Sequence, residues 1–240
     1  MKIALLGYGK MGREVEKAAL RSGHEVILKV DISNPGDLSP EILSRADAAI
    51  EFTTPETAPG NIKACFKAGL PVIVGTTGWY AHFDELTALC RQEEGTLFHA
   101  TNFSIGVAVF FHLNRVLAGI MNSQTDYDVS MEEIHHTRKL DAPSGTAITA
   151  AEIILEQIDR KANWENGEKA SAESKLLITS IRKEDIPGTH TVTYQSGIDA
   201  IELKHTAFSR AGFASGAVAA AEWVKDRKGV FTMNDMLRFN

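Results

Sequence analysis

The chain has 240 residues, of which 44% are hydrophobic and 23% charged, and its formal net charge is −6 at pH 7. This composition is typical of a soluble globular protein of one large or two small domains, and the negative charge argues against a general nucleic-acid binder. There is no apolar run of the roughly 18 residues that a membrane span needs, and the only cysteines, Cys65 and Cys90, lie outside any CxxC pair. We therefore expect no nucleic-acid or membrane partner, no disulfide scaffold or structural zinc, and a reducing, cytoplasmic location.

In the first hundred residues, short apolar runs alternate with helical patterns. Strands are predicted at 2–6, 25–30, 46–52, 71–74 and 96–100, and helices at 10–21, from after 52 to about 67, and at 80–94. A turn through Asn34, Pro35 and Gly36 follows the second strand. Strands that alternate with helices favour parallel pairing with right-handed crossovers. The predicted fold class is therefore α/β, with an N-terminal Rossmann-like, doubly wound parallel sheet.

After Asn102 the order of elements changes. Helices are predicted at 104–121 and 144–159, strands at 127–135, 175–181, 188–195 and 199–208, a polar loop at 161–174, and a final helix at about 209–228. Consecutive strands after an α/β half indicate a second, α+β domain on a mixed or antiparallel sheet. We expect one domain at 1–103, completed by the C-terminal segment 209–240, and another at 104–208.

The segment Gly7-Tyr8-Gly9-Lys10-Met11-Gly12 is a GxGxxG motif between a predicted strand and a predicted helix. Its glycines suit a tight turn, a close approach to a pyrophosphate and close helix–strand packing, and the helix start offers free N–H groups. Asp31 follows the second strand, about 20 residues after Gly12, where an acid can bond a ribose 2′-hydroxyl. Three turn glycines with an incidental aspartate are the alternative. We favour a dinucleotide site, for NADH, NADPH or both.

Two further loops follow strands at the same carboxyl edge, where ligands of open α/β sheets bind. They are Gly75-Thr76-Thr77-Gly78 and Thr101-Asn102-Phe103-Ser104, the second preceded by Ala100. Their hydroxyl and amide groups suit a nicotinamide or its ribose. Taken alone, each loop is more often ordinary turn chemistry than a binding site, and that interpretation stays open.

The most informative segment runs from Glu133 to Ala147. Within it, four groups are or can become cationic: His135, His136, Arg138 and Lys139. Ser144 then caps a helix that opens with Gly145 and Thr146, a place for a carboxylate or phosphate. A solvated basic loop is the alternative, and a zinc site is disfavoured because the histidines lack helical HExxH spacing. Since a dinucleotide enzyme needs an acid and an anion clamp, we favour a catalytic site and expect no metal.

The run from His135 to Ala147, HHTRKLDAPSGTA, resembles the signature HHxxKxDAPSGTA of the bacterial dihydrodipicolinate reductase family. The resemblance covers essentially the whole chain. It implies a cytoplasmic, NAD(P)H-dependent oxidoreductase that reduces 4-hydroxy-tetrahydrodipicolinate in lysine and diaminopimelate biosynthesis. It also implies a homotetramer built through the second-domain sheets, with the first domain binding the cofactor and the second binding the substrate.

The resemblance also implies roles for individual residues. His135 is then the acid/base residue and Lys139 a proton donor, and the dicarboxylate substrate rests on His136 and the helix start at Ser144, Gly145 and Thr146. The implied cofactor positions are Gly7 to Gly12, Asp31, Gly75, Thr76, Thr77, Ala100, Thr101, Asn102 and Phe103. The expected reaction is hydride transfer from C4 of the nicotinamide to C4 of a conjugated cyclic imine.

Some alternatives stay open. Asp31 is followed by Ile32 and Ser33, without the arginine found there in some members, so the choice between NADH and NADPH is not fixed. Another two-domain dehydrogenase, such as an aspartate dehydrogenase, would share the first domain but has no use for the whole signature. A non-catalytic NADH-sensing protein needs no acid near the nicotinamide and usually carries a basic DNA-reading segment.

Overall fold

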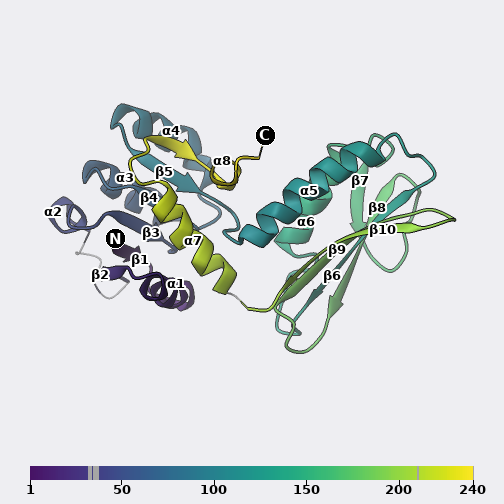
Figure 1. Ribbon diagram of the computed structural model, residues 1–240, viewed down its shortest axis with the longest axis horizontal. Helices are drawn as coiled ribbons and strands as arrows, with labels where there is room; N and C mark the ends of the chain where they lie inside the picture. Colours follow the sequence, from purple (N-terminus) through teal and green to yellow (C-terminus); the bar gives the residue numbers. More distant parts are fainter. Residues whose placement is uncertain (32–33, 35–37, 210, 240) are drawn as a thin grey trace. The chain divides into compact units, whose positions relative to one another are not determined.

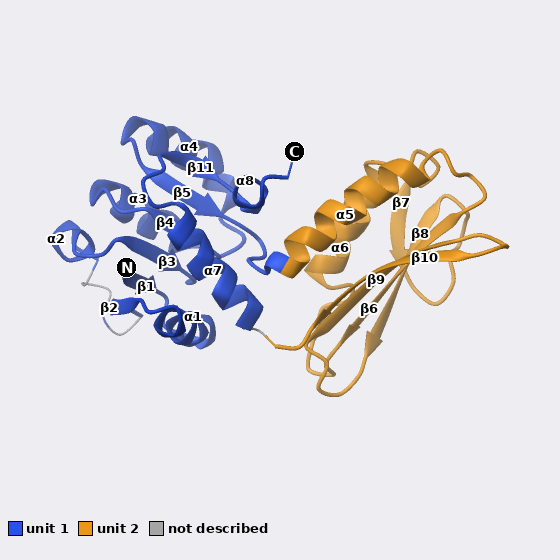
Figure 2. Cartoon of the chain, viewed as in Figure 1, with its two compact units in different colours: residues 1–105, 211–240 blue, residues 106–210 orange. Residues whose placement is uncertain are grey.

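The computed structural model describes residues 1–31, 34, 38–209 and 211–239. The chain divides into two compact units, one of residues 1–105 with 211–240 and one of residues 106–210 (Figure 2). The expected boundaries, after residues 103 and 208, fall close to these divisions. Part of the predicted turn, Pro35 and Gly36, and the two residues after Asp31 lie outside the described residues.

Unit 1 is built on a six-stranded sheet in the order β11-β5-β4-β3-β1-β2, in which all neighbours are parallel. Its central strands are fully buried apolar runs, as parallel strands covered on both faces require. The strands are β1 (Lys2–Leu6), β2 (Glu25–Val30), β3 (Ala48–Glu51), β4 (Val72–Val74), β5 (Thr96–His99) and β11 (Gly229–Phe231). The predicted doubly wound parallel sheet is confirmed, and its order reverses beside β1, where such sheets bind ligands.

Helices cover both faces of this sheet (Figure 1). On one face lie α1 (Lys10–Arg21) and α7 (Ala211–Trp223), which pack on each other through small residues, and on the other lie α2 (Pro40–Leu43), α3 (Ala58–Lys67) and α4 (Phe83–Gln92). The main core joins apolar side chains of α3 and α4 to those of the strands. The short helix α8 (Met233–Leu237) follows β11.

The predicted final helix, 209–228, extends five residues too far. Helix α7 ends at Trp223, and Asp226 takes a left-handed backbone conformation (φ 62°) that turns the chain back toward the sheet. The chain then forms β11, which pairs in parallel with β5. This pairing joins segments far apart in the sequence, so no local sequence pattern predicts strand β11. The predicted helix at 80–94 likewise separates into a 3₁₀ turn, Tyr80–His82, and α4.

Unit 2 is a five-stranded sheet in the order β10-β9-β6-β8-β7. Strand β9 pairs antiparallel with β6 and β10, and β8 pairs in parallel with β6 and β7, so the predicted mixed sheet is confirmed. The strands are β6 (Asp128–His135), β7 (Asn163–Asn166), β8 (Lys175–Arg182), β9 (Gly188–Gln195) and β10 (Ala200–Ala207). The predicted loop at 161–174 therefore contains β7, a polar edge strand without the apolar alternation that marks a strand.

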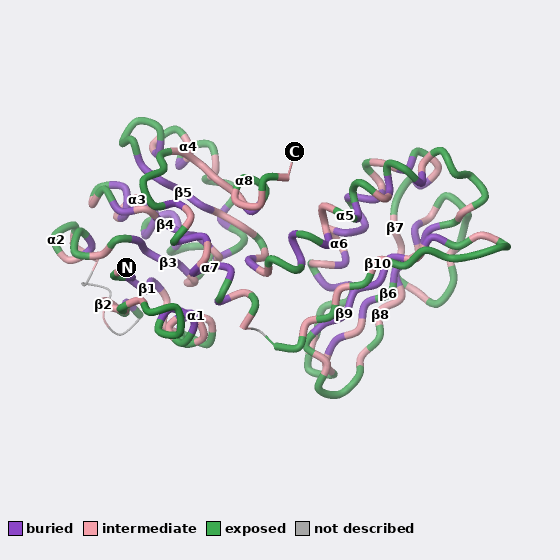
Figure 3. The backbone as a smooth tube through the Cα atoms, viewed as in Figure 1, coloured by how far each residue is buried: buried purple, intermediate pink, exposed green. Residues whose placement is uncertain are grey.

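Two helices, α5 (Ile105–Met121) and α6 (Gly145–Leu155), lie together on one face of this second sheet (Figure 1). Their apolar sides meet alternate residues of β6, β8 and β9 in a single core. Figure 3 shows that buried residues are concentrated in the inner strands of each unit and recur along the helices. Across the described residues, no helix is both long and apolar enough to cross a membrane.

Candidate active site

The glycine-rich loop after β1 has the geometry that a diphosphate requires. Gly7 has a φ of +94°, and a Cβ there would lie 2.6 Å from the carbonyl carbon of Phe52, so only glycine fits. A Cβ at Gly12 would lie 3.2 Å from the carbonyl carbon of Gly7 and closer still to its oxygen. Gly9 differs, because a Cβ there would meet nothing within 4 Å, and no side chain caps α1 at this residue. The start of α1 therefore has no side-chain cap at Gly9, and its first-turn N–H groups suit a bound dinucleotide.

Tyr8 stands beside a cluster of charged side chains. Its hydroxyl bonds to Glu16, the Nζ of Lys29 lies 3.3 Å from that hydroxyl, and Arg13 lies 5.6 Å from the ring centroid. Hydrogen bonds from Lys29 and Tyr8 lower the pKa of Glu16. The positive charge of Lys29 is therefore balanced by Glu16.

Asp31 follows β2 at the carboxyl edge of the sheet, as predicted. Its N–H donates to Oδ1 of Asn34 at 2.7 Å, and the side-chain amide of Asn34 donates to the carbonyl of Lys29 at 2.9 Å. These bonds place Asn34 beside the end of β2. They hold the exposed Asp31 near the end of β2.

The loop after β4 is fixed from inside the protein. A Cβ at Gly75 would lie 2.7 Å from Cδ1 of Phe52, so this glycine leaves room for the ring. Thr76 is only 7% exposed, and its hydroxyl accepts the N–H of Thr53 at 2.8 Å. The Thr76 hydroxyl therefore ties two loops together, and Thr77, which is exposed, is the side chain that this loop presents outward.

A buried acid lies under these loops. Glu51, the last residue of β3, is 0% exposed. Its carboxylate accepts the N–H of Thr53 at 3.0 Å and lies 3.4 Å from the amide of Asn61. Burial raises the pKa of Glu51 in spite of these bonds.

The loop after β5 is held by aromatic packing and by α7. Asn102 accepts the N–H of Ser104 at 2.8 Å, and Phe103 is buried, with its ring centroid 5.8 Å from that of Phe98. Gly216 in α7 faces the backbone of this loop, because a Cβ there would lie 2.8 Å from the carbonyl carbon of Phe103. Ala100 and the exposed Thr101 complete the loop.

In unit 2, a carboxylate and a histidine meet on the buried face of β6. Glu133 and His135 are two positions apart, so both point to the same face of the strand. Glu133 is 0% exposed and bonds to Nδ1 of His135, and Arg182 of β8 lies 2.9 Å from its other oxygen. Burial alone would raise the pKa of Glu133, but the bonds to His135 and Arg182 outweigh it and lower this pKa to about 2.

A second buried histidine lies beside the first. His190 on β9 is the register partner of Glu133, and its ring centroid is 5.1 Å from that of His135. Its Nε2 lies 3.0 Å from the hydroxyl of Ser144. Burial, reinforced by the neighbouring His135, lowers the pKa of His190 to about 4, so this ring is neutral at pH 7.

The three side chains of Glu133, His135 and His190 bring ligand-type atoms within 4.8 Å of one another. The guanidinium of Arg182 already balances the carboxylate, and its charge disfavours a second cation there. His190 also has Ser144 as a partner. The carboxylate and the two imidazoles are therefore better suited to proton transfer than to metal binding.

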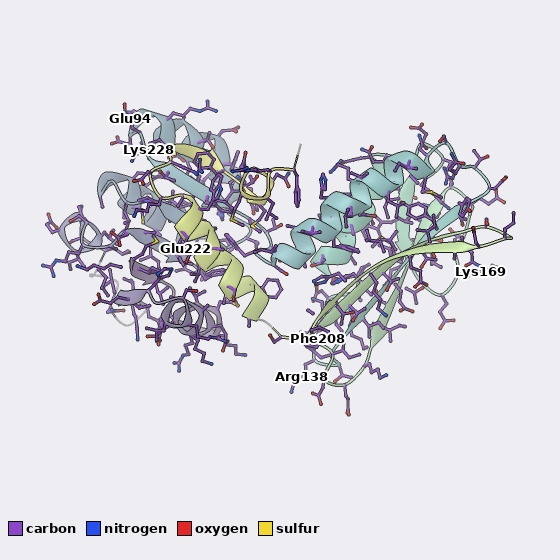
Figure 4. The ribbon with its side chains drawn as sticks, viewed as in Figure 1. Glu94, Arg138, Lys169, Phe208, Glu222 and Lys228 are labelled. Carbon is purple, nitrogen blue, oxygen red and sulfur yellow. The ribbon has the colours of Figure 1, made fainter. Side chains whose placement is uncertain are left out.

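The loop after β6 carries the remaining cations of the signature. Lys139 bonds to both carboxylate oxygens of Asp141 at 2.8 Å, which lowers the pKa of Asp141. Arg182 donates to the carbonyl of Asp141 at 2.7 Å, so it ties this loop to β8. Arg138, labelled in Figure 4, lies exposed on the same loop, and His136 is half-buried at its start.

The start of α6 is open, as an anion site requires. Ser144 is the N-cap, and its hydroxyl accepts the N–H of Ala147 at 3.2 Å. A Cβ at Gly145 would meet nothing within 4 Å, and Thr146 is half-buried beside it. The hydroxyl of Ser144 thus serves the helix, and the open N–H groups are those of the first turn.

Sequence reasoning did not single out several of these residues. Glu133 is visible two positions before His135, and the period of a strand could have paired them. Arg182 and His190 come from other strands, so only the register of the sheet brings them to the site. Glu51 ends an apolar strand at the carboxyl edge, which is a weak signal by itself.

A doubly wound sheet with a glycine-rich phosphate loop, joined in one chain to a unit with a buried Glu–His pair and an open helix start, defines an NAD(P)H-dependent oxidoreductase. Residues 1–103 match the family described as "Dihydrodipicolinate reductase, N-terminus", and residues 106–237 match "Dihydrodipicolinate reductase, C-terminus". The chain belongs to the dihydrodipicolinate reductase family.

Individual relatives agree with this assignment. A 4-hydroxy-tetrahydrodipicolinate reductase of Christiangramia forsetii is 48% identical over 239 residues, covering 99% of this chain and 98% of the relative. One of Neisseria meningitidis is 33% identical and covers 94% of this chain and 84% of the relative. Among solved structures, the dipicolinate-bound dihydrodipicolinate reductase of Paenisporosarcina shares the fold, with a TM-score of 0.82 at 24% identity over 99% of both chains.

Proposed function

We propose that this chain reduces 4-hydroxy-tetrahydrodipicolinate to tetrahydrodipicolinate with NADH or NADPH, the reduction step of lysine and diaminopimelate biosynthesis. The relative that is 48% identical over nearly the whole chain bears the name of this activity. The observation that carries the proposal is the buried Glu133–His135 pair, which lies in the signature segment just ahead of the open start of α6. A proton donor and an anion clamp are what this reduction needs.

Unit 1 binds the cofactor in this proposal. The backbone of Gly7 to Gly12 holds the diphosphate at the start of α1, and Asp31 bonds the ribose hydroxyls. The loops Gly75–Thr77 and Ala100–Phe103 face the nicotinamide end. When bound, the nicotinamide supplies the hydride that reduces C4 of the conjugated cyclic imine.

Unit 2 binds the dicarboxylate and supplies the proton. One carboxylate accepts the first-turn N–H groups at Gly145 and Thr146, with His136 and Lys139 adding positive charge. His135 gives a proton from Nε2 to the atom that becomes negative when the hydride arrives, and Lys139 is the second donor. Ser144 acts indirectly, because its hydroxyl caps α6.

The test is direct. Enzymatically generated substrate is added with NADH and, separately, with NADPH, and the loss of nicotinamide absorbance is followed. We expect oxidation of at least one cofactor by the wild type and by the surface control Lys169→Ala, whose side chain is exposed in the loop after β7 (Figure 4). No oxidation with either cofactor would refute the proposed function.

We further propose that the protein is a cytoplasmic homotetramer assembled through the sheets of unit 2. Ile134 and Ile181 are register partners on the face of the sheet that α5 and α6 do not cover, and Ile181 is 37% exposed. Both cysteines are free and buried, which suits a reducing compartment. Light scattering after size exclusion measures the mass, and a monomer at micromolar concentration would contradict the tetramer.

A further inference from the structure

The acid of the Glu–His pair is unusual in its position. Within the described part of unit 2, Glu133 is the one carboxylate among the fully buried polar side chains. The other inward residues of β6 include the apolar Val129 and Met131. An apolar side chain at position 133 would therefore pack better than a carboxylate. Burying a carboxylate is costly unless it is paired, so its partners indicate what it does.

The partners of Glu133 leave its charge balanced and its hydrogen-bond direction fixed. Its pKa of about 2, set by the bonds to His135 and Arg182 against the opposing effect of burial, keeps the carboxylate ionised at neutral pH. An ionised carboxylate only accepts hydrogen bonds, so Nδ1 of His135 carries the hydrogen in this pair. The opposite nitrogen, Nε2, is then the one that can gain or lose a proton.

The opposite side of the ring is kept clear by a glycine. A Cβ at Gly188, the first residue of β9, would lie 2.9 Å from Nε2 of His135 and 3.2 Å from Cδ2. Any side chain at this position would crowd the nitrogen that Glu133 leaves available. Of the His135 side chain, 10% remains exposed.

We propose that Glu133 is a positioning residue that fixes His135 with Nδ1–H toward the carboxylate and Nε2 toward the substrate, and that Gly188 keeps the Nε2 side open. The proposal rests on the proposed role of His135 as proton donor. The imidazolium gives the Nε2 proton to the substrate as the hydride arrives, and a neutral ring remains with its hydrogen on Nδ1. A solvent proton then returns to Nε2. Glu133 stays ionised throughout and stabilises the charged ring before each transfer.

The other titratable and charged groups near the Glu133–His135 pair come from the second sheet and the signature loop. Arg182 on β8 contacts Glu133, and the neutral His190 on β9 contacts His135. His205 on β10 and Lys139, which is paired with Asp141, act on His190. Lys139 and Asp141 form an ion pair, and Arg182 is opposed by Glu133. Burial lowers the pKa of His205, as it does that of His190. Glu133 is therefore the acid in direct contact with the ring.

The first test removes the charge and keeps the shape. Glu133→Gln should lower kcat about 10²-fold, the lower end of what a positioned general acid contributes, and change KM for the substrate and the Kd of NADH little. Its kcat should also decline at lower pH than that of the wild type, because the amide no longer stabilises the imidazolium. Glu152→Gln, at an exposed position of α6, is the control and should match the wild type. A wild-type pH profile for Glu133→Gln would overturn the proposal.

The second test crowds Nε2. Gly188→Ala should lower kcat, whereas Gly197→Ala, where a Cβ meets nothing within 4 Å, should not. Equal turnover of the two variants would refute the role of Gly188.

A measurement on the wild type does not depend on whether a variant folds. Nitrogen-15 spectra of labelled histidine, assigned with His135→Ala, should show the neutral ring with its hydrogen on Nδ1. A hydrogen on Nε2 would overturn the inference. If His135→Ala keeps full turnover, the proposed function of His135 fails, and if only Glu133→Gln behaves as the wild type, the positioning role alone fails.

Discussion

Gly216 controls how closely α7 approaches the loop after β5, and its replacement by alanine tests that contact. In an ordinary helix interior, alanine is more favourable than glycine by about 0.5–1 kcal/mol. At Gly216 the added Cβ would lie 2.8 Å from the carbonyl carbon of Phe103 and closer still to its oxygen, so the loop or the helix must move. Overpacking of this kind costs about 1–3 kcal/mol. The clash therefore outweighs the gain in helix propensity.

Gly60 in α3 provides the matched control, because a Cβ there would meet nothing within 4 Å. We expect Gly216→Ala to be about 1–3 kcal/mol less stable than Gly60→Ala, or roughly 2–4 °C in Tm for each kcal/mol. Because Phe103 belongs to a predicted cofactor loop, KM for NADH should rise in Gly216→Ala alone. Urea unfolding followed by circular dichroism, with steady-state kinetics, measures both effects. Equal stability of the two variants and an unchanged KM would refute the reasoning.

Three further predictions concern the site. His135→Ala and Lys139→Ala should each lower turnover by roughly 10²- to 10⁴-fold with NADH binding intact, and wild-type turnover in both would remove the proton-donor assignment. NADH should be used at least as well as NADPH, by about tenfold or less, because Asp31 repels a 2′-phosphate; a strong NADPH preference in kcat/KM would show that Asp31 points away from the ribose. Burial lowers the pKa of His190 to about 4 from an ordinary 6.5, so the unfolded chain takes up its proton first. As the pH is lowered from about 6.5 to about 4, the free energy of unfolding should then fall, by on the order of 3 kcal/mol at most. His190→Gln should flatten that fall in urea titrations, and an unchanged slope would contradict it.

The parts of the fold that could be predicted from the sequence are those with a local hydrophobic periodicity. The strand, glycine loop and helix around Gly7 could be predicted because each glycine has a local steric role. Strands β7 and β11 were missed because their evidence is a pairing partner elsewhere in the chain. The short α2, with its Pro40 at the first turn and Ser39 as cap, carried a local signal that was overlooked.

The candidate site divides in the same way. The signature placed His135, Lys139 and Gly145 on one continuous segment, so a single stretch of sequence was sufficient. The partners that define the chemistry of His135 are different, because Arg182 and His190 reach it only through the register of β8 and β9. For Thr76 the sequence suggested a hydroxyl that is available to a ligand. In the structure that hydroxyl accepts the N–H of Thr53, a contact that the local sequence does not reveal.

The pairing of β11 with β5 has a consequence for biosynthesis on the ribosome. Unit 1 is made of two stretches of chain, and residues 106–210, which form the whole of unit 2, are translated between them. The nascent chain can therefore complete the second unit while the first still lacks α7 and β11. Until the last stretch emerges, β5 has an open edge that can pair with strands of other chains. Residues 211–231 thus protect the first unit from aggregation once they have been translated.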